Sequence, residues 1–287
     1  MSDQSPAVAI LMPDVRPPLW PGWVSLDRLK WPLGRPDRLA EGTLCDLGSQ
    51  DHLIGFPQNL FLLVPRRKTR AHVSILMAEP EALHASQYRK VVREAQEFHR
   101  VLTYNEDLLA RLPNGIFFPY GSTWVPDWQE QDLTKHSLCS LIASKKRHLP
   151  GHALRHEIAK WCRAKGVDVD FMGRAYKPLR DKAEGLAPYR YSVVIENVRE
   201  RNFFTEKLID AVLCLTVPIY WGCPNIGDFM DISGMITCET EEDLRDALSS
   251  MSEAGYTARL PGLRTARPDA EAYSDIFERA ARAVLED

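Results

Sequence analysis

The sequence predicts an α/β protein built from two Rossmann-like βα domains that face a central cleft. Its 287 residues approach twice the length of an average domain of about 150 residues. Short β-rich runs alternate with helical patterns along the chain, which is typical of parallel sheets covered by helices. A polar stretch at residues 127–135 separates two such series and has the composition of a linker. We therefore expect one domain at residues 1–134 and a second at residues 135–287.

The first domain is predicted to contain short strands separated by helices. The strands are expected at residues 8–12, 60–64, 73–77 and 100–104. One helix is expected at residues 86–98, and a second begins after Asn105, because asparagine is a favoured N-cap. Residues 13–58 are rich in Pro, Trp and Gly and receive no regular structure. They form either a long loop or an insertion that shapes a ligand site.

The second domain repeats the pattern in a clearer order. Its strands are expected at residues 138–143, 167–172, 191–195 and 217–220, and its helices at residues 152–164, 205–215 and 241–251. Gly166 ends the first helix, since glycine readily adopts the left-handed conformation that closes a helix. Thr240 and Asp243 form a capping box that starts the last one. A final helical pattern at residues 270–285 is expected to pack back against one of the two domains.

Composition excludes several functional classes. The chain has 36 Lys and Arg against 39 Asp and Glu, so its net charge of −3 lacks the basic excess of a nucleic-acid binder. No apolar run approaches the roughly 18 residues that span a bilayer, and the N-terminus lacks the features of a signal peptide. The six cysteines contain no C-x-x-C pair, which argues against a zinc knuckle and favours reduced, buried thiols. We expect a cytoplasmic protein without an integral membrane segment.

The residues best suited to chemistry gather after the strand at residues 191–195. This strand ends in Glu196 and Asn197, and the next helix opens on Thr205, Glu206 and Lys207. In parallel sheets ligands bind at the carboxyl ends of the strands. A carboxylate there accepts hydrogen bonds from sugar hydroxyls, and a helix N-terminus with a lysine suits phosphate. The alternative is that Glu206 only complements the helix dipole and that Lys207 is solvated.

The same segment resembles the signature of the α1,3-fucosyltransferase family. That family has a Phe-Glu-Asn strand end, an aromatic-x-Thr-Glu-Lys helix start and a Val-Pro-(Val/Ile)-Tyr-x-Gly strand. The chain has Ile-Glu-Asn at residues 195–197, Phe-Phe-Thr-Glu-Lys at residues 203–207 and Val-Pro-Ile-Tyr-Trp-Gly at residues 217–222. The resemblance is less tight over residues 138–250 and loose back to about residue 73. It implies a GT-B fold, with an acceptor-binding domain first and a nucleotide-sugar domain second.

The resemblance also implies which residues bind the donor nucleotide sugar. Arg155 matches the family position that contacts the nucleotide diphosphate, and a guanidinium fork suits paired phosphate oxygens. Ser144 and Lys145 lie where the family has a Ser-Asn turn, although a solvated basic turn is the alternative for residues 145–148. The implied donor site consists of Ser144, Lys145, Arg155, Glu196, Asn197, Phe203, Thr205, Glu206 and Lys207.

Glu79 is implied to be the catalytic base. It follows the strand at residues 73–77 and matches the strand-end glutamate that the family uses. Inverting transfer requires a base that removes the acceptor hydroxyl proton while the anomeric carbon is attacked. Glu81 is the neighbour most easily confused with it, because alternation along an extended segment directs both side chains to one face. An ordinary surface carboxylate is the alternative interpretation of Glu79.

The resemblance implies inverting transfer of L-fucose from GDP-fucose to a hydroxyl of an acceptor glycan, of the α1,3 type. No cofactor or metal is implied. Asp168 and Asp170 spell the D-x-D pattern that holds a metal ion in other glycosyltransferases, but the resemblance places the diphosphate on Arg155 and Lys207 instead.

Two alternative functions remain open. One is a related GT-B enzyme that uses another nucleotide sugar, and the other is a catalytically inactive protein that binds nucleotide sugars or glycans. Donor hydrolysis or transfer separates them. The resemblance implies a bacterial-type cytoplasmic enzyme acting on surface-glycan precursors. We expect no nucleic-acid partner, and peripheral membrane association is left open.

Overall fold

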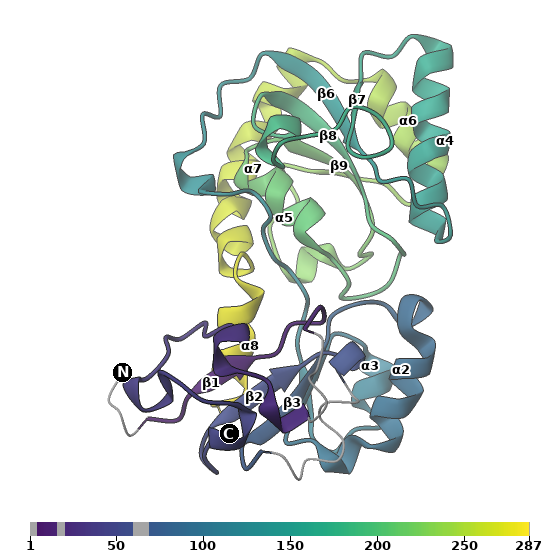
Figure 1. Cartoon of the computed structure of the whole chain (residues 1–287). Helices are drawn as coiled ribbons and strands as arrows, with labels where there is room; N and C mark the ends of the chain where they lie inside the picture. Colours follow the sequence, from purple (N-terminus) through teal and green to yellow (C-terminus); the bar gives the residue numbers. More distant parts are fainter. Residues whose placement is uncertain (1–4, 16–20, 60–68, 287) are drawn as a thin grey trace. The chain divides into compact units, whose positions relative to one another are not determined.

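The chain divides into two compact units (Figure 1). The computed structural model describes residues 5–15, 21–59 and 69–286, so the strand predicted at residues 60–64 lies outside the described residues. The first unit comprises Met1–Pro119 and Ile276–Asp287, and the second comprises Tyr120–Asp275. Each unit is built on its own five-stranded parallel sheet. The predicted α/β class with two parallel-sheet domains is confirmed.

The strands of the first sheet follow one another in chain order. They are β1 Val8–Ile10, β2 His52–Gly55, β3 His72–Met77, β4 Val101–Thr103 and β5 Gly115–Phe117. The strands predicted at residues 8–12, 73–77 and 100–104 are confirmed as β1, β3 and β4. The sequence does not predict β2 or β5, because both are short and contain glycine, which weakens a strand pattern.

The helices of the first unit begin where the chain leaves a strand end. Helix α2 (Glu81–Arg93) starts and ends earlier than predicted, because Pro80 occupies its N-cap with φ −62° and proline presets the backbone for a helix start. Helix α3 (Glu106–Leu109) follows Asn105 as predicted, and the Asn105 side chain accepts the Leu108 N–H at 2.8 Å. Helix α8 (Ile276–Ala283) contacts β1.

The segment between β1 and β2 is a structured part of the core. Its described residues form short 3-10 turns, among them Leu26–Arg28, Asp37–Leu39 and Leu44–Asp46. Leu26, Leu39 and Leu44 are buried in the hydrophobic core of the unit. The sequence did not predict these turns, because each is too short to leave a periodic pattern.

The second sheet has the strand order β10-β9-β8-β6-β7. Its strands are β6 Ser137–Ile142, β7 Asp170–Met172, β8 Tyr189–Ile195, β9 Val217–Trp221 and β10 Ile236–Thr237. All four strands predicted for this domain are confirmed, although β7 is shorter than expected. Of its five strands, only the two-residue β10 was not predicted.

Helices cover both faces of this second sheet (Figure 1). They are α4 Pro150–Lys165, α5 Glu206–Leu213, α6 Glu241–Ser249 and α7 Glu253–Ala272. Helices α4 and α6 pack in one hydrophobic cluster with Val193, whereas α5 shares another with the neighbouring Val194. Because successive strand residues point to opposite faces, α5 lies on the face opposite α4 and α6. Gly166 ends α4 with φ 67°, as predicted.

The unit boundary falls before the polar stretch rather than after it. We predicted a division between residues 134 and 135, but residues 120–134 pack with the second unit. Thr123 Oγ1 and the Trp124 N–H both donate to the Asp210 carboxylate of α5, at 2.7 and 2.9 Å, and Trp128 lies in the same core. At the other end, the pattern predicted as one helix at residues 270–285 is the end of α7 followed by the separate helix α8.

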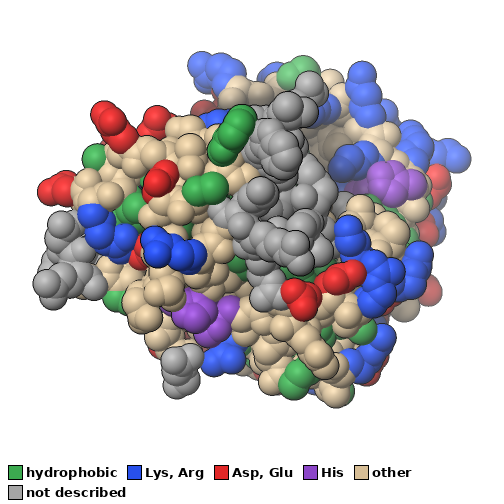
Figure 2. Space-filling model, turned by 60° about the horizontal axis from the view of Figure 1, so that its bottom comes forward, with side chains coloured by type: hydrophobic (Ala, Val, Ile, Leu, Met, Phe, Trp, Pro, Cys, Tyr) green, Lys and Arg blue, Asp and Glu red, His purple; other side chains and the backbone are tan. Residues whose placement is uncertain are grey.

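The described surface carries charges of both signs, as the face in Figure 2 shows. Five of the six free cysteines are buried, and Cys45 is exposed, as expected for buried thiols. No helix among the described residues has both the length and the apolar composition that crossing a membrane requires.

Candidate functional site

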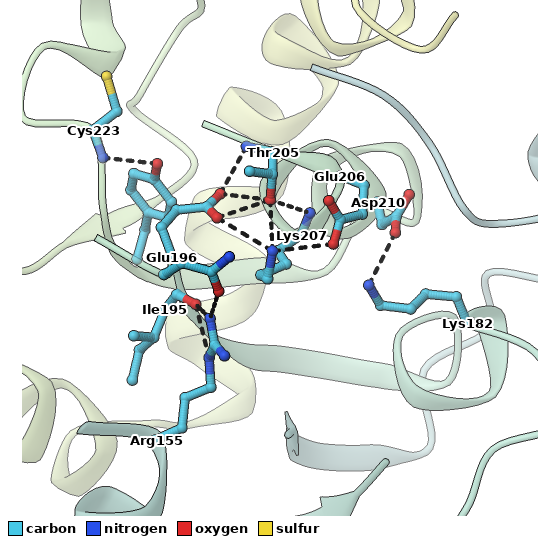
Figure 3. Close-up of polar contacts among 11 residues, drawn as sticks. Arg155, Lys182, Ile195, Glu196, Thr205, Glu206, Lys207, Asp210 and Cys223 are labelled. Carbon is cyan, nitrogen blue, oxygen red and sulfur yellow. Dashed lines mark hydrogen bonds and ion pairs between the residues drawn. The ribbon is translucent and has the colours of Figure 1, made fainter. Parts of the chain in front are cut away.

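The end of β8 and the start of α5 hold a group of polar side chains in contact (Figure 3). Glu196 follows β8 and is completely buried. Thr205 is the N-cap of α5, and its backbone N–H and its hydroxyl both donate to the Glu196 carboxylate, each at 2.8 Å. The Lys207 ammonium donates to Thr205 Oγ1 at 2.9 Å. It also lies 3.1 Å from the Glu206 carboxylate and 3.4 Å from that of Glu196.

Arg155 reaches the same strand end from helix α4. Its Nε donates to the carbonyl oxygen of Ile195 at 2.9 Å, and its Nη2 donates to that oxygen and, at 3.1 Å, to Asn197 Oδ1. Among the described residues none accepts from Nη1, which leaves part of the guanidinium fork for a ligand. We call this group the strand-end cluster. It consists of Arg155, Glu196, Asn197, Thr205, Glu206 and Lys207.

Two glycines allow the backbone to approach this cluster closely. A Cβ on Gly151 would lie 1.7 Å from the carbonyl oxygen of Glu196, and the Gly151 N–H donates to the Asn197 carbonyl at 3.0 Å. A Cβ on Gly222 would lie 2.5 Å from the Tyr220 hydroxyl and 2.6 Å from Glu196 Cγ. Both contacts are too short for any side chain, so these positions require glycine for the cluster to keep its shape.

The acidic and basic groups of the cluster stabilise each other's charges. Burial alone would raise the pKa of Glu206, but Lys207 and Lys182 hold it below its ordinary value. Burial would likewise lower the pKa of Lys207, yet Glu206 and Glu196 keep it above its ordinary value. Because an unpaired buried charge is costly, both groups stay ionised at neutral pH. A ligand that draws on the Lys207 ammonium must therefore share it with the carboxylates.

A second buried ion pair lies one helical turn further along α5. Asp210 is completely buried and its carboxylate lies 3.3 Å from the Lys182 ammonium, while burial raises the pKa of Asp210. Sequence reasoning missed both residues. The signal available was a lone carboxylate within the otherwise apolar Leu208–Leu213 stretch of α5, since such a residue needs a buried partner.

Three other residues implied for the donor site lie outside these contacts. Ser144 Oγ accepts the Lys146 N–H in a turn at 3.4 Å. Lys145 is exposed and lines a separate pocket. Phe203 is completely buried and therefore supports the loop before Thr205 rather than presenting its ring at the surface.

Glu79 lies in the first unit, in the turn between β3 and α2. It is half-buried, and the Tyr88 hydroxyl donates to its backbone carbonyl at 2.6 Å, which fixes the turn. Its position at the carboxyl end of a strand is as predicted. The expected alternation that would direct Glu79 and Glu81 to one side is wrong, because Glu81 is already the first residue of α2.

The D-x-D pattern does not gather further ligands in this part of the chain. Asp170 begins β7 and accepts a hydrogen bond from the Tyr189 hydroxyl at 2.7 Å, and Asp168 is exposed in the turn before it. Across the residues that the structure describes, no group of three or more His, Cys, Asp or Glu is placed to hold a metal ion.

His152 makes the stability of the second unit depend on pH. It is buried at the start of α4, and burial, together with the positive charges of Arg155, His148 and Lys146, lowers its pKa to about 4. In the unfolded chain the His152 ring takes up a proton near pH 6.5, so above pH 6.5 the ring is neutral in both states and proton uptake does not favour unfolding. As the pH falls from 6.5 towards 4, the unfolded state binds more protons than the folded state, and the free energy of unfolding decreases.

We therefore expect urea denaturation to show a lower free energy of unfolding at pH 5 than at pH 7. In His152→Gln the loss between these two pH values should be smaller. An equal loss in both proteins would show that other groups cause the pH dependence.

Parts of the chain are similar in sequence to known proteins, and the whole chain is similar in fold to solved structures. A putative fucosyltransferase-like protein of Arabidopsis thaliana is 33% identical over 101 residues, which is 34% of this chain and 19% of the relative. The α-(1,3)-fucosyltransferase FucT of Helicobacter pylori is 40% identical over 48 residues, which is 17% of this chain and 10% of that enzyme. The matches thus span a small part of these relatives. No protein-family profile matches the chain.

Solved structures share the fold. A crystal structure of an α1,3-fucosyltransferase matches with a TM-score of 0.53 and 15% identity over 100% of this chain and 92% of the other. One with GDP matches with a TM-score of 0.51, 14% identity and coverage of 100% and 93%. TarM of S. aureus reaches 0.56 with 13% identity, covering 83% of this chain and 54% of TarM. Part of the chain is thus similar in sequence to fucosyltransferases, and the chain has the two-sheet GT-B fold.

Proposed function

We propose that the chain is a glycosyltransferase that transfers L-fucose from GDP-fucose to a hydroxyl of an acceptor glycan, with inversion and in an α1,3 linkage. The strand-end cluster supports this most strongly. It places two carboxylates and two cations at the carboxyl end of parallel strands, where α/β folds bind nucleotides. The cytoplasmic location and the surface-glycan acceptor implied by the resemblance belong to the same proposal.

In this proposal the strand-end cluster binds the donor. Lys207 is the more exposed of its cations, with 24% of its side chain accessible, and the Nη1 group of Arg155 has no partner among the described residues. Both suit the oxygens of a diphosphate, and the N-terminus of α5 adds its positive dipole end. The Glu206 carboxylate can accept hydrogen bonds from the paired hydroxyls of the ribose.

The chemical step requires a base and a stabilised leaving group. Glu79 takes the proton from the acceptor hydroxyl while that oxygen bonds to the anomeric carbon. The bond between this carbon and the diphosphate breaks, and its electron pair leaves with GDP. Arg155 and Lys207 stabilise the negative charge that develops there.

A thermal-shift panel of GDP, GDP-fucose, UDP, UDP-glucose and CDP tests the donor. A ligand that binds only the folded state raises its stability, by about 2.7 kcal/mol at a hundredfold excess over Kd. We expect stabilisation by GDP and GDP-fucose. Stabilisation by UDP and UDP-glucose alone would favour a related enzyme with another donor, and GDP-fucose binding without hydrolysis or transfer would favour an inactive binding protein.

We expect fucosyl transfer to survive removal of divalent metals. The charge of the departing diphosphate falls on Arg155, Lys207 and the start of α5, so the proposed mechanism needs no ion. Initial rates measured with and without EDTA should agree. Loss of turnover in EDTA, restored by Mn²⁺ or Mg²⁺, would contradict the mechanism and return Asp168 and Asp170 to consideration.

A further inference from the structure

Four cationic side chains line a pocket of about 550 Å³ in the second unit. Lys145 and Arg147 come from the loop between β6 and α4, and Lys160 and Arg163 come from successive turns of α4. None of the residues that line the pocket belongs to the strand-end cluster. The space is comparable in size to the pockets that hold small organic ligands.

The positive charge of this pocket is not balanced by the protein. Glu157 is the only carboxylate among its lining residues. Within residues 69–286, no carboxylate lies in ion-pair distance of any of the four cations. The whole chain has a net charge of −3, so this excess is local. Like charges around one pocket repel one another, and a bound anion relieves that repulsion.

His156 and Tyr176 form one wall of the pocket and contact each other. His156 is 7% exposed, and its Nε2 lies 3.3 Å from the Lys146 carbonyl. Because a carbonyl only accepts, Nε2 donates to it, and Nδ1 lies 3.1 Å from the Tyr176 hydroxyl.

The same wall holds the guanidinium of Arg163. The guanidinium carbon lies 4.8 Å from the Tyr176 ring centroid and 4.7 Å from that of Phe171. Stacking of this kind orients a guanidinium without using its N–H donors. Arg163 therefore presents an oriented fork to a ligand.

We propose that this pocket, the basic pocket, binds a small organic phosphate at a site distinct from that of the donor diphosphate. An arginine fork with neighbouring lysines binds the oxygens of a phosphate group through charge-assisted hydrogen bonds. The volume lies within the range of sites that hold small organic ligands, so we take the phosphate to be part of a larger molecule. The inference does not depend on the proposed fucosyl transfer.

Isothermal titration with glucose 1,6-bisphosphate, in the presence of saturating GDP, tests the proposal. We expect one bisphosphate per chain. Arg147→Gln/Lys160→Gln should weaken binding about tenfold or more, since two charged hydrogen bonds are lost. Both residues are exposed, so the variant should fold. The control Arg111→Gln/Lys165→Gln removes the same charge from exposed positions outside the pocket and should bind as the wild type does.

The outcomes that overturn the proposal are distinct. Absence of bisphosphate binding both with and without GDP, or equal weakening in both double variants, would remove the pocket as a binding site. Bisphosphate binding that occurs only without GDP would assign the pocket to the nucleotide. Equal affinity for inorganic phosphate would remove the organic part of the ligand from the proposal. A chain that fails to bind GDP would contradict the proposed function, while the same titration without GDP would still test the basic pocket.

Discussion

Glu79→Gln should lower kcat by about 10²–10⁴-fold and leave the Kd for the donor nearly unchanged. The carboxylate lies at the carboxyl end of β3, and the Tyr88 hydroxyl fixes its backbone. If Glu79 takes the acceptor proton only while the new bond forms, it stabilises the transition state and not the bound donor. Its loss should therefore lower kcat without changing the Kd for the donor. Initial rates on a verified acceptor and calorimetric donor binding check both quantities.

Glu81→Gln is the matched control for this prediction. Glu81 is exposed in the first turn of α2, so its loss should change kcat little. Near-normal turnover of Glu79→Gln would contradict the assignment. An inactive Glu81→Gln with an active Glu79→Gln would move the base two residues along the chain.

Gly151→Ala should destabilise the second unit by about 3 kcal/mol or more, because overpacking against backbone cannot relax through a rotamer change. The new Cβ would lie 1.7 Å from the Glu196 carbonyl oxygen, so α4 must move away from β8. For a unit of this size the expected fall in Tm is roughly 6–12 °C. The movement would also pull Arg155 from the strand end and weaken GDP binding.

Calorimetry of Gly151→Ala beside Gly227→Ala checks this second prediction. Gly227 is exposed, and a Cβ there meets nothing closer than 3.7 Å, so its Tm should stay near that of the wild type. A Gly151→Ala protein that melts with the wild type would show that α4 and β8 are not packed as described.

The strand-end cluster could be predicted because its information is local in the sequence. Glu196 ends a buried strand, and Thr205 starts a helix within the same short segment. Only part of the role of Arg155 could be predicted from the sequence. The family resemblance implied that it binds an anion, but its hydrogen bonds to the Ile195 carbonyl and Asn197 depend on how α4 packs on β8. The same holds for the buried pair of Lys182 and Asp210, whose partners lie far apart in the chain.

The sequence predicts no helix over residues 253–269, because this part of α7 contradicts a local rule. Helix α7 contains Pro261 and Pro268, and proline costs about 3 kcal/mol inside a helix. Burial of its apolar face in the core offsets that cost, since Leu263 and Ala266 are completely buried. Gly262 adds a close approach, because a Cβ there would lie 2.4 Å from the backbone nitrogen of Gly234.

Titration of GDP into the wild type and into Lys207→Met tests the central claim, that the strand-end cluster binds the donor. Methionine keeps much of the length of the side chain and removes the ammonium. We expect GDP to bind the wild type and the variant to lose about 1.5–3 kcal/mol of binding free energy, which is about 10- to 150-fold in Kd. Lys165→Met, at an exposed position on α4, should bind GDP as the wild type does. Undiminished GDP affinity in folded Lys207→Met would contradict the claim.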